Sequence, residues 1–359
     1  MDLFDVRNYQ FTLPEELIAA EPLAQRDRSR LLVVNRKSRT WEHRIFSDLP
    51  EILDPGTVLV ANNTRVIRAR LLGEREGTGG KVEFFMLRKV DSACWTGLMK
   101  TGARVVPGFR FRIPDRHGGW VAGEVIGREE SPAGVILTAK FSRDPVEADI
   151  GEVPLPPYIV AKRKDWGPEE LETYNTVFGT QSGSVAAPTA GRHFTPELIA
   201  SLRSGRMDWQ ELTLHVGIGT FKPVSVPDVR DHLMHAEPVQ ISSEVAASLN
   251  ASKRAGKTIL AVGTTTTRAL EGRSVPGSAG FELVSGMSDV NLFIHPGAGY
   301  EWKFTDAMIT NFHLPGSTLL MMIASRIGDL GFTLRVYEEA VRERYRFYSY
   351  GDAMLILDR

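Results

Sequence analysis

The chain has 359 residues, with 43 lysines and arginines against 44 aspartates and glutamates, a formal net charge of −1 and 42% hydrophobic residues. This length is sufficient for two domains that each have a hydrophobic core. The single cysteine, Cys94, excludes an intrachain disulfide framework and a cysteine-based metal cluster, and it favours a reducing cytoplasm. The balanced charge gives no global sign of nucleic-acid binding, so any RNA contact must come from local basic patches.

The N-terminal segment predicts a short helix followed by two strands. Pro14 to Ala20 has a helix signal with proline near its first turn. Apolar runs at Leu31 to Val34 and Thr57 to Ala61 are typical of strands, and Asp54-Pro55-Gly56 predicts a turn between them. The opening residues lack a basic stretch and an apolar core, so we expect no signal peptide.

The next segment, from about residue 66, has a different sequence pattern and predicts a β-rich unit. Short strand-like runs recur at 66–72, 81–87, 95–99, 109–113, 120–126 and 135–141. Glycine-rich turns separate them, and no helix signal interrupts them. Six short strands at this spacing predict a small antiparallel barrel.

After the proline cluster at 154–157 the pattern becomes α/β. Strand-like runs at 211–216, 258–262 and 353–357 alternate with helix signals that begin at Thr195-Pro196, at Glu244 and at Ser317. We therefore expect an α/β main domain formed by residues 1–65 and 154–359. An antiparallel β-barrel domain, residues 66–153, is expected to be inserted in it.

Histidines gather in this later segment, near glycine, threonine or proline and in predicted loops, where binding and catalytic residues often lie. They are His193, His215, His232, His235, His295 and His313. The small-residue run 184–191 leads to His193 and then to a helix start. Small side chains let a ligand approach the backbone. The alternative is a tight loop packed under other elements.

Two further loops follow predicted strands. Residues 214–221 contain a G-x-G at Gly217 and Gly219, followed by Thr220, but the full dinucleotide fingerprint is absent, which excludes a Rossmann site. Residues 262–268 open a helix, where Thr264, Thr265 and Arg268 can hold a carboxylate. The alternative for the second loop is an ordinary helix cap with a surface arginine.

The remaining polar clusters suit proton handling more than metal binding. The spacing of His232, His235 and Glu237 is not a standard zinc pattern, so a histidine–carboxylate pair is the better interpretation. Asn311 and His313 precede a helix whose natural N-cap is Ser317. That position is suited to ligand contacts, and a plain polar turn is the alternative.

Together these segments resemble the tRNA ribosyltransferase-isomerases of queuosine biosynthesis. That family has, in this order, close relatives of LPEELIAAEPLAQRDRSRLLVV, NNTRVIRARLLG, LPPYI, YNTVFGTQSGSVAAPTAGRHFT, LTLHVGIGTFKPV, HLMHAE, AVGTTTTRALE, TNFHLPGSTLLM and YRFYSYGDAMLIL. The resemblance runs from about Leu13 to Leu357 and is weakest in the expected insertion. The family fold, a larger α/β domain with an inserted β-barrel, agrees with the interpretation above.

The resemblance implies the reaction. The family transfers the ribosyl group of S-adenosylmethionine to tRNA that bears 7-aminomethyl-7-deazaguanine and isomerises it, forming epoxyqueuosine and releasing adenine and methionine. It implies no metal and no cofactor, since S-adenosylmethionine is a co-substrate, and a cytoplasmic enzyme with no membrane contact and no obligate protein partner.

Combined with the residue patterns, the resemblance gives three sets of expected site residues. Proton chemistry falls to His193, His235 or His313, with Glu237 orienting one of them, because an unperturbed histidine titrates near working pH. His193 ranks first, as it ends the small-residue loop at a helix start. Expected substrate contacts are His215, Gly217, Gly219, Thr220, Gly263, Thr264, Thr265, Arg268, Asn311, Ser317 and Thr318. Expected RNA contacts are Arg65, Arg68, Arg70, Lys162 and Arg346.

The chain departs from the family pattern at a few positions. Asn63 replaces an aspartate, Arg192 replaces a leucine, residues 295–300 contain two extra residues, and residues 325–328 differ. These changes keep a second hypothesis open, a divergent tRNA-binding paralogue without catalysis. A metal-dependent hydrolase, a third hypothesis, rests only on the number of histidines.

Overall fold

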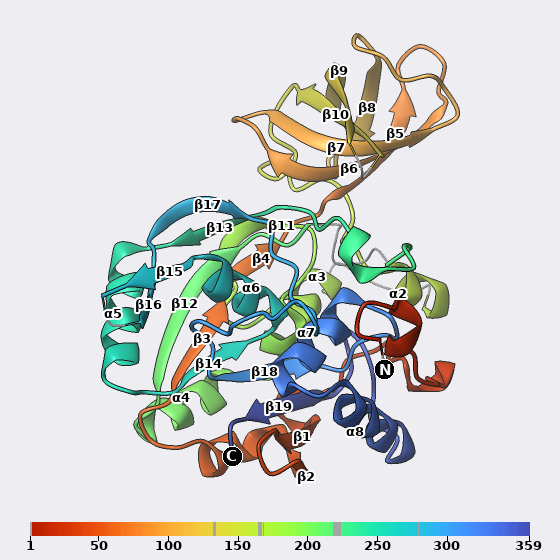
Figure 1. Cartoon of the computed structure of the whole chain (residues 1–359). Helices are drawn as coiled ribbons and strands as arrows, with labels where there is room; N and C mark the ends of the chain where they lie inside the picture. Colours follow the sequence, from red (N-terminus) through yellow and green to blue (C-terminus); the bar gives the residue numbers. More distant parts are fainter. Residues whose placement is uncertain (1, 132–133, 164–166, 168, 218–223, 279) are drawn as a thin grey trace.

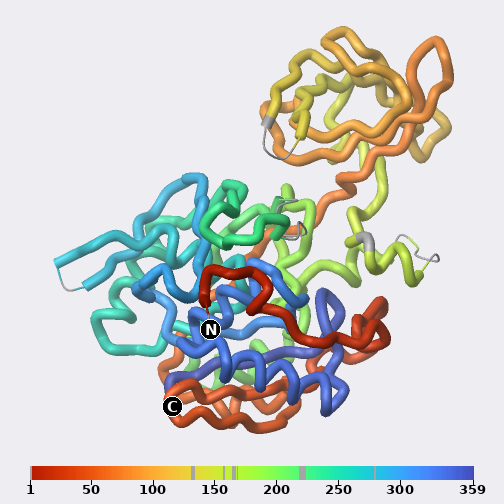
Figure 2. Tube along the Cα trace, turned by 45° about the vertical axis from the view of Figure 1, so that its right-hand side comes forward, coloured from red at the N-terminus to blue at the C-terminus, as the bar shows by residue number. Residues whose placement is uncertain are grey.

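The computed structural model describes residues 2–131, 134–163, 167, 169–217, 224–278 and 280–359. It consists of a large α/β body and a β-barrel that stands on one side of it (Figures 1 and 2). None of the helices in these ranges has the length and apolar character needed to cross a bilayer.

The body is built on a mixed sheet of nine strands. In spatial order they are β17 (Gly286–Val290), β13 (Glu237–Ile241), β12 (Asp208–Leu214), β3 (Val58–Asn62), β14 (Ile259–Val262), β18 (Ala307–Asn311), β19 (Ala353–Leu357), β1 (Arg30–Asn35) and β2 (Thr40–Ile45). From β12 to β18 the neighbours are parallel, and the early strand β1 pairs in parallel with the late strand β19. The body is therefore assembled from both ends of the chain, as expected.

Both faces of this sheet are covered, which explains the continuous apolar runs of strands such as β1, β14 and β19. In β1, Leu31 and Val33 pack into one core while Leu32 and Val34 pack into the core on the opposite face. Strands buried on both faces have continuous apolar runs instead of alternating ones. The longer helices of the body are α4 (Pro196–Ser204), α5 (Ser243–Arg254), α6 (Thr264–Gly272), α7 (Thr318–Ile327) and α8 (Leu330–Arg342).

Shorter elements connect these layers. The short α-helices are α1 (Leu49–Ile52), α2 (Pro157–Lys162) and α3 (Glu170–Tyr174). The 3-10 turns are η1 (Val6–Tyr9), η2 (Glu15–Leu17), η3 (Arg26–Arg28), η4 (Phe46–Asp48), η5 (Thr189–His193) and η7 (Val229–Asp231). A hairpin of β15 (Ser274–Gly277) and β16 (Gly280–Leu283) packs against α5.

The inserted segment forms the expected antiparallel barrel. Its strands are β5 (Arg70–Arg75), β6 (Lys81–Lys89), β7 (Cys94–Thr101), β8 (Arg110–Pro114), β9 (Trp120–Ser131) and β10 (Gly134–Phe141), closed in the order β10-β7-β6-β5-β8-β9. Phe84, Phe111 and Phe141 fill the interior, with ring centroids 5.7–5.8 Å apart. A Cβ at Gly97 or Gly123 would lie 2.5 Å from a phenylalanine ring, so only glycine fits beside these rings.

Two local predictions are wrong. Pro14 to Ala20 forms only the turn η2, because Ala19 donates its N–H to the carbonyl of Phe347 and Ile18 forms a bridge to the same residue. The run at 66–72 is also not one strand. β4 (Thr64–Val66) pairs with β11 (Gln181–Ser184) in the body, and the barrel begins only at β5.

Candidate functional site

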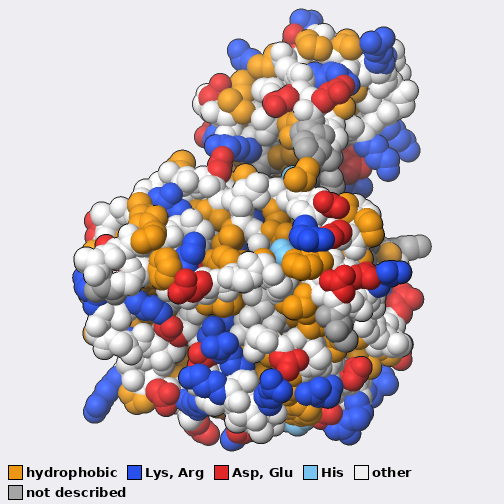
Figure 3. All heavy atoms as spheres, in the orientation of Figure 1, with side chains coloured by type: hydrophobic (Ala, Val, Ile, Leu, Met, Phe, Trp, Pro, Cys, Tyr) orange, Lys and Arg blue, Asp and Glu red, His pale blue; other side chains and the backbone are white. Residues whose placement is uncertain are grey.

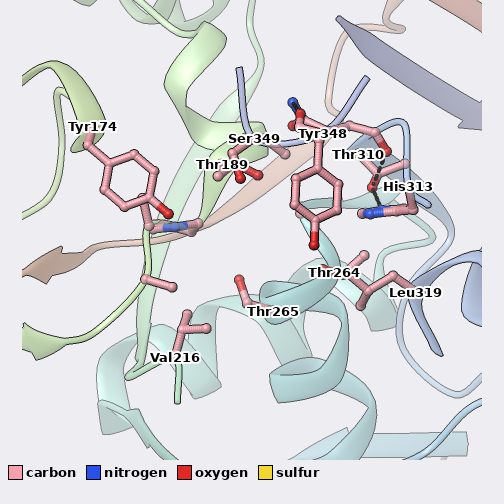
Figure 4. A pocket seen from close by; sticks show the side chains of 16 residues that line it. Tyr174, Thr189, Val216, Thr264, Thr265, Thr310, His313, Leu319, Tyr348 and Ser349 are labelled. Atoms are coloured by element: carbon pink, nitrogen blue, oxygen red, sulfur yellow. Dashed lines mark hydrogen bonds between the residues drawn. The ribbon is translucent and has the colours of Figure 1, made fainter. Parts of the chain in front are cut away.

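A cavity opens at the carboxyl ends of β14 and β18, the edge of a parallel sheet where ligands commonly bind (Figure 4). It encloses about 590 Å³ of space free of atoms, a figure that includes the open solvent at its mouth. Its lining residues are Tyr174, Ala186, Ala187, Pro188, Thr189, Ala190, Val216, Gly263, Thr264, Thr265, Thr310, Asn311, His313, Leu319, Tyr348 and Ser349.

The small-residue loop forms one wall of this cavity. Ser184 fixes the loop, since its hydroxyl donates to the carbonyl of Ala186 at 2.7 Å and accepts the N–H of Val216 at 2.9 Å. Residues 186–190 then line the cavity, and a Cβ at Gly263 would lie only 3.5 Å from Ala190. The two interpretations of the loop are therefore compatible, because the loop is tightly packed and also forms part of a cavity wall.

The start of α6 forms the floor. Gly263 has φ of 92°, which favours glycine, and donates its N–H to Ile309 at the end of β18. Thr264 and Thr265 follow it at the helix start and line the cavity. The side chain of Asn62 donates to the Thr265 hydroxyl at 3.3 Å, so the floor is tied to the end of β3.

The end of β18 supplies the expected polar residues. His313 lines the cavity, and its Nε2 lies 2.7 Å from the Thr310 hydroxyl. Burial lowers the pKa of His313 to about 3, so its imidazole is neutral at neutral pH. Asn311 donates from its side chain to the carbonyl of Tyr348 at 3.0 Å and thereby holds the opposite wall.

His193 lies behind this wall and does not line the cavity. Its Nδ1 is 2.6 Å from the Ser29 hydroxyl, in the body interior. Burial lowers the pKa of His193, and the positive charge of Arg192 lowers it further, to about 3. The nearby Asn311 side chain acts to raise this pKa, but its effect is smaller. A neutral imidazole near Asn311 supports the wall from behind, and the role of His193 as the base stays a prediction.

Arg192, where the family usually has leucine, lies behind the cavity wall and supports it. Its guanidinium donates to the carbonyl of Thr173 at 3.0 and 3.2 Å and to that of Ser349 at 3.0 Å, and it stacks 4.2 Å from the Tyr350 ring. Burial lowers the pKa of Arg192 to about 10. Its side chain joins two segments that border the cavity without lining the cavity itself.

Arg268 was expected to contact the substrate, but its side chain does not line the cavity. It forms an ion pair with Glu237, Nη1 to Oε2 at 2.9 Å, and both side chains are only 3% exposed. The other Glu237 oxygen accepts the N–H of Gly217 at 3.0 Å, and the Arg268 guanidinium also reaches the carbonyl of His235 at 3.5 Å. Glu237 therefore holds Arg268 and Gly217 in place.

Several other expected contacts also lie beside the cavity and not in its lining. His215 has its Nδ1 2.8 Å from the Thr64 hydroxyl, and burial lowers the pKa of His215. Ser317 is the N-cap of α7, accepting the N–H of Leu320, and Thr318 is the first residue of that helix. Gly219 and Thr220 lie outside the described residues.

The lining residues without a functional prediction from the sequence include Tyr174, Tyr348 and Ser349. They come from the end of α3 and from the turn before β19, far apart in the chain. The available signal was the aromatic density of the YRFYSYGD segment, which periodicity alone does not distinguish from core packing.

The expected RNA contacts are already engaged within the protein. Arg65 pairs with Glu172, Arg68 with Asp149, Arg70 with Glu83 and Glu152, while Lys162 and Arg346 donate to the carbonyls of Glu15 and Glu21. On the face in Figure 3, basic and acidic side chains are interspersed over both body and barrel. A phosphate at these residues must compete with carboxylates, and their RNA role stays a prediction.

Within the described ranges no cluster of metal-ligating side chains occurs.

Comparison with known proteins gives a consistent family. The family model described as "Queuosine biosynthesis protein" matches residues 6–356. The chain belongs to this family. It is 43% identical over 354 residues to the S-adenosylmethionine:tRNA ribosyltransferase-isomerase of Clostridioides difficile and 45% identical over 354 residues to that of Symbiobacterium thermophilum. Both alignments cover 98% of this chain and 99% of the relative.

A solved structure agrees with this assignment. The crystal structure of S-adenosylmethionine tRNA ribosyltransferase from Thermotoga maritima is 34% identical, with a TM-score of 0.53 over 98% of this chain and 100% of that one. The fold class expected from the sequence, an α/β domain with an inserted barrel, is confirmed. The expectation of a transferase enzyme is confirmed by the curated relatives, which are ribosyltransferase-isomerases.

The Arg268–Glu237 pair gives a first prediction. Arg268→Ala removes one partner of a buried ion pair, which costs about 3–5 kcal/mol of unfolding free energy. The double variant Arg268→Met/Glu237→Gln removes both charges and should cost clearly less. Urea unfolding measures both. An Arg268→Ala variant of unchanged stability would instead favour the ligand-binding arginine expected from the sequence.

The neutral histidines give a prediction for pH dependence. The pKa of His313 is about 3 in the fold against an ordinary 6.5, so the unfolded chain binds more protons between these values. Stability is therefore fully present above about pH 6.5 and is lost as the pH falls toward 3. The decline of Tm with falling pH should be shallower in His313→Asn than in the wild type. Exposed His117 provides the control, His117→Asn, whose profile should match the wild type.

Proposed function

We propose that this chain transfers and isomerises the ribosyl group of S-adenosylmethionine onto the 7-aminomethyl-7-deazaguanine base of tRNA, forming epoxyqueuosine-tRNA with release of adenine and methionine. The observation that carries the proposal is the convergence of separate motifs on one cavity. Residues of the small-residue loop, the Thr264–Thr265 helix start and the Asn311–His313 turn all line it. The curated relatives named for this chemistry match over nearly the whole chain.

The cavity suits S-adenosylmethionine as a co-substrate. Its walls combine small apolar residues with two tyrosines, and its polar groups come from threonines, a serine, an asparagine, the tyrosine hydroxyls and a neutral histidine. The sulfonium of S-adenosylmethionine acidifies the adjacent C5′ hydrogens, so a neutral base beside it can begin the rearrangement. Within the described residues, His313 is the one member of the expected proton-handling set that lines the cavity. We assign it that role on its position alone, because burial makes its imidazole a weaker base than an ordinary histidine.

The direct test of the function is incubation of the purified protein with S-adenosylmethionine and tRNA that carries the aminomethyl base. Nucleoside mass analysis should show the added rearranged ribosyl group, with adenine released in equal amount and no methylated nucleoside. A chain that binds this tRNA without releasing adenine would instead be the non-catalytic paralogue.

His313 gives the corresponding variant. His313→Ala should lower kcat by about 10²–10⁴, the usual effect of losing a general acid or base. Because its pKa is about 3, His313 should contribute no limb near pH 6.5 to the pH profile of kcat/KM. His43→Ala, on the far strand β2, is the matched control and should keep the wild-type kcat. A His313→Ala variant that turns over within a few-fold of wild type would remove His313 as the base.

A further inference from the structure

Two tyrosines enter the cavity from opposite sides. Figure 4 shows Tyr174 and Tyr348 with their rings directed into the space between them, above Thr264 and Thr265. Tyr174 ends the short helix α3, and Tyr348 belongs to the turn before β19. The loops that carry these rings are joined by the buried Arg192, which bonds to the carbonyls of Thr173 and Ser349.

Tyr174 has a hydroxyl without a hydrogen-bond partner in the described part of the chain, although the residue is 0% exposed. The backbone of Ala187 and the side chain of Ser349 lie near the phenol oxygen and favour its ionised form, but burial dominates and raises the pKa of Tyr174 to about 12. The group is therefore a protonated donor at neutral pH, and its O–H lacks an acceptor. Such a buried donor is unfavourable unless a ligand or a water molecule in the cavity supplies the acceptor.

Tyr348 is held in a conformation that tyrosine rarely adopts. Its φ is 76°, in the left-handed region. Its N–H donates to Phe312 at 3.0 Å, its carbonyl accepts from Asn311 at 3.0 Å, and its ring meets the Tyr158 ring edge-on with centroids 4.3 Å apart. Strain of this kind persists where the surroundings enforce it, typically at ligand sites. Here it fixes an aromatic face at the cavity.

We propose that this cavity is a purine subsite, in which the ring of Tyr348 stacks on the base and the Tyr174 hydroxyl donates to an unprotonated ring nitrogen. The inference rests on the proposed function, which supplies the purine as the adenine of S-adenosylmethionine. Stacking needs only the π face, while the Tyr174 donor requires a ring nitrogen with a free lone pair, which adenine offers at N1, N3 and N7. The second source of a purine-like ring is the 7-deazaguanine base of the tRNA, and the experiment separates the two.

Calorimetric titration with S-adenosylmethionine, in the absence of tRNA, tests the subsite. Tyr174→Phe should weaken binding about fivefold, the effect of one net hydrogen bond. Tyr348→Leu should weaken it roughly fivefold to hundredfold, while Tyr348→Phe, which keeps the ring, should remain near wild type. Tyr9→Phe is the matched control, because it removes a buried hydroxyl bonded to Leu3 outside the cavity, and it should leave the affinity unchanged.

Analogues of S-adenosylmethionine with a ring nitrogen replaced by C–H make the test specific. The analogue that lacks the accepting nitrogen should bind the wild type as weakly as Tyr174→Phe binds the natural compound, and should lose nothing further in that variant. Unchanged affinity in folded Tyr174→Phe and Tyr348→Leu overturns the subsite. Weakened tRNA affinity alone assigns the cavity to the tRNA base and overturns the adenine assignment. A wild type that binds S-adenosylmethionine neither alone nor with the aminomethyl-bearing tRNA present overturns the proposed function itself.

Discussion

The side-chain amide of Asn62 is the interaction on which the site depends most. At the carboxyl end of β3, its oxygen accepts the N–H groups of Thr64 and Leu214, and its nitrogen donates to the carbonyl of Leu214 and to the Thr265 hydroxyl. The residue is 1% exposed, so these bonds form where no water competes. One amide thus joins the end of β12, the strand that leads to the barrel and the first turn of α6.

The same dry environment sets the chemical character of the cavity. His193 and His313 are both neutral because burial opposes a second proton, and neither has a carboxylate partner among the causes of its pKa shift. The proposed substrate, S-adenosylmethionine, carries a positive sulfonium and would meet a neutral imidazole and hydroxyl groups in the cavity, without repulsion from an imidazolium. The acidic groups nearby are already committed, as Glu237 is to Arg268.

Much of the architecture could be predicted because it depends on local sequence. Apolar runs identified β1, β3, β14 and β19, and turn spacing identified the five barrel strands β6 to β10, since both signals arise from neighbouring residues. Thr195 and Ser317 cap α4 and α7 as expected. The helix at Pro14 could not be corrected from sequence, because its competitor is a bridge to Phe347, which lies more than three hundred residues away.

Within the candidate site, the loops that carry the motifs could be predicted from the sequence. The protonation of the side chains and the direction in which each side chain points could not. Arg268 has the same neighbours in sequence whether it meets a ligand or Glu237, and only the fold decides between them. The protonation of His193 likewise depends on burial. Tyr174 and Tyr348 come close to the same cavity only after α3 and the turn before β19 have packed together. Their spacing in the sequence therefore could not predict that they share a site.

The pairing of β1 with β19 also bears on how the protein is made. β19 lies between β18 and β1 in the sheet and joins them through antiparallel and parallel ladders. During synthesis β1 emerges early and has only β2 beside it until residues 353–357 appear. The barrel strands, by contrast, are all complete by residue 141. The barrel can therefore close during translation. The sheet beneath the cavity can form completely only after residues 353–357, which make up β19, have been synthesised.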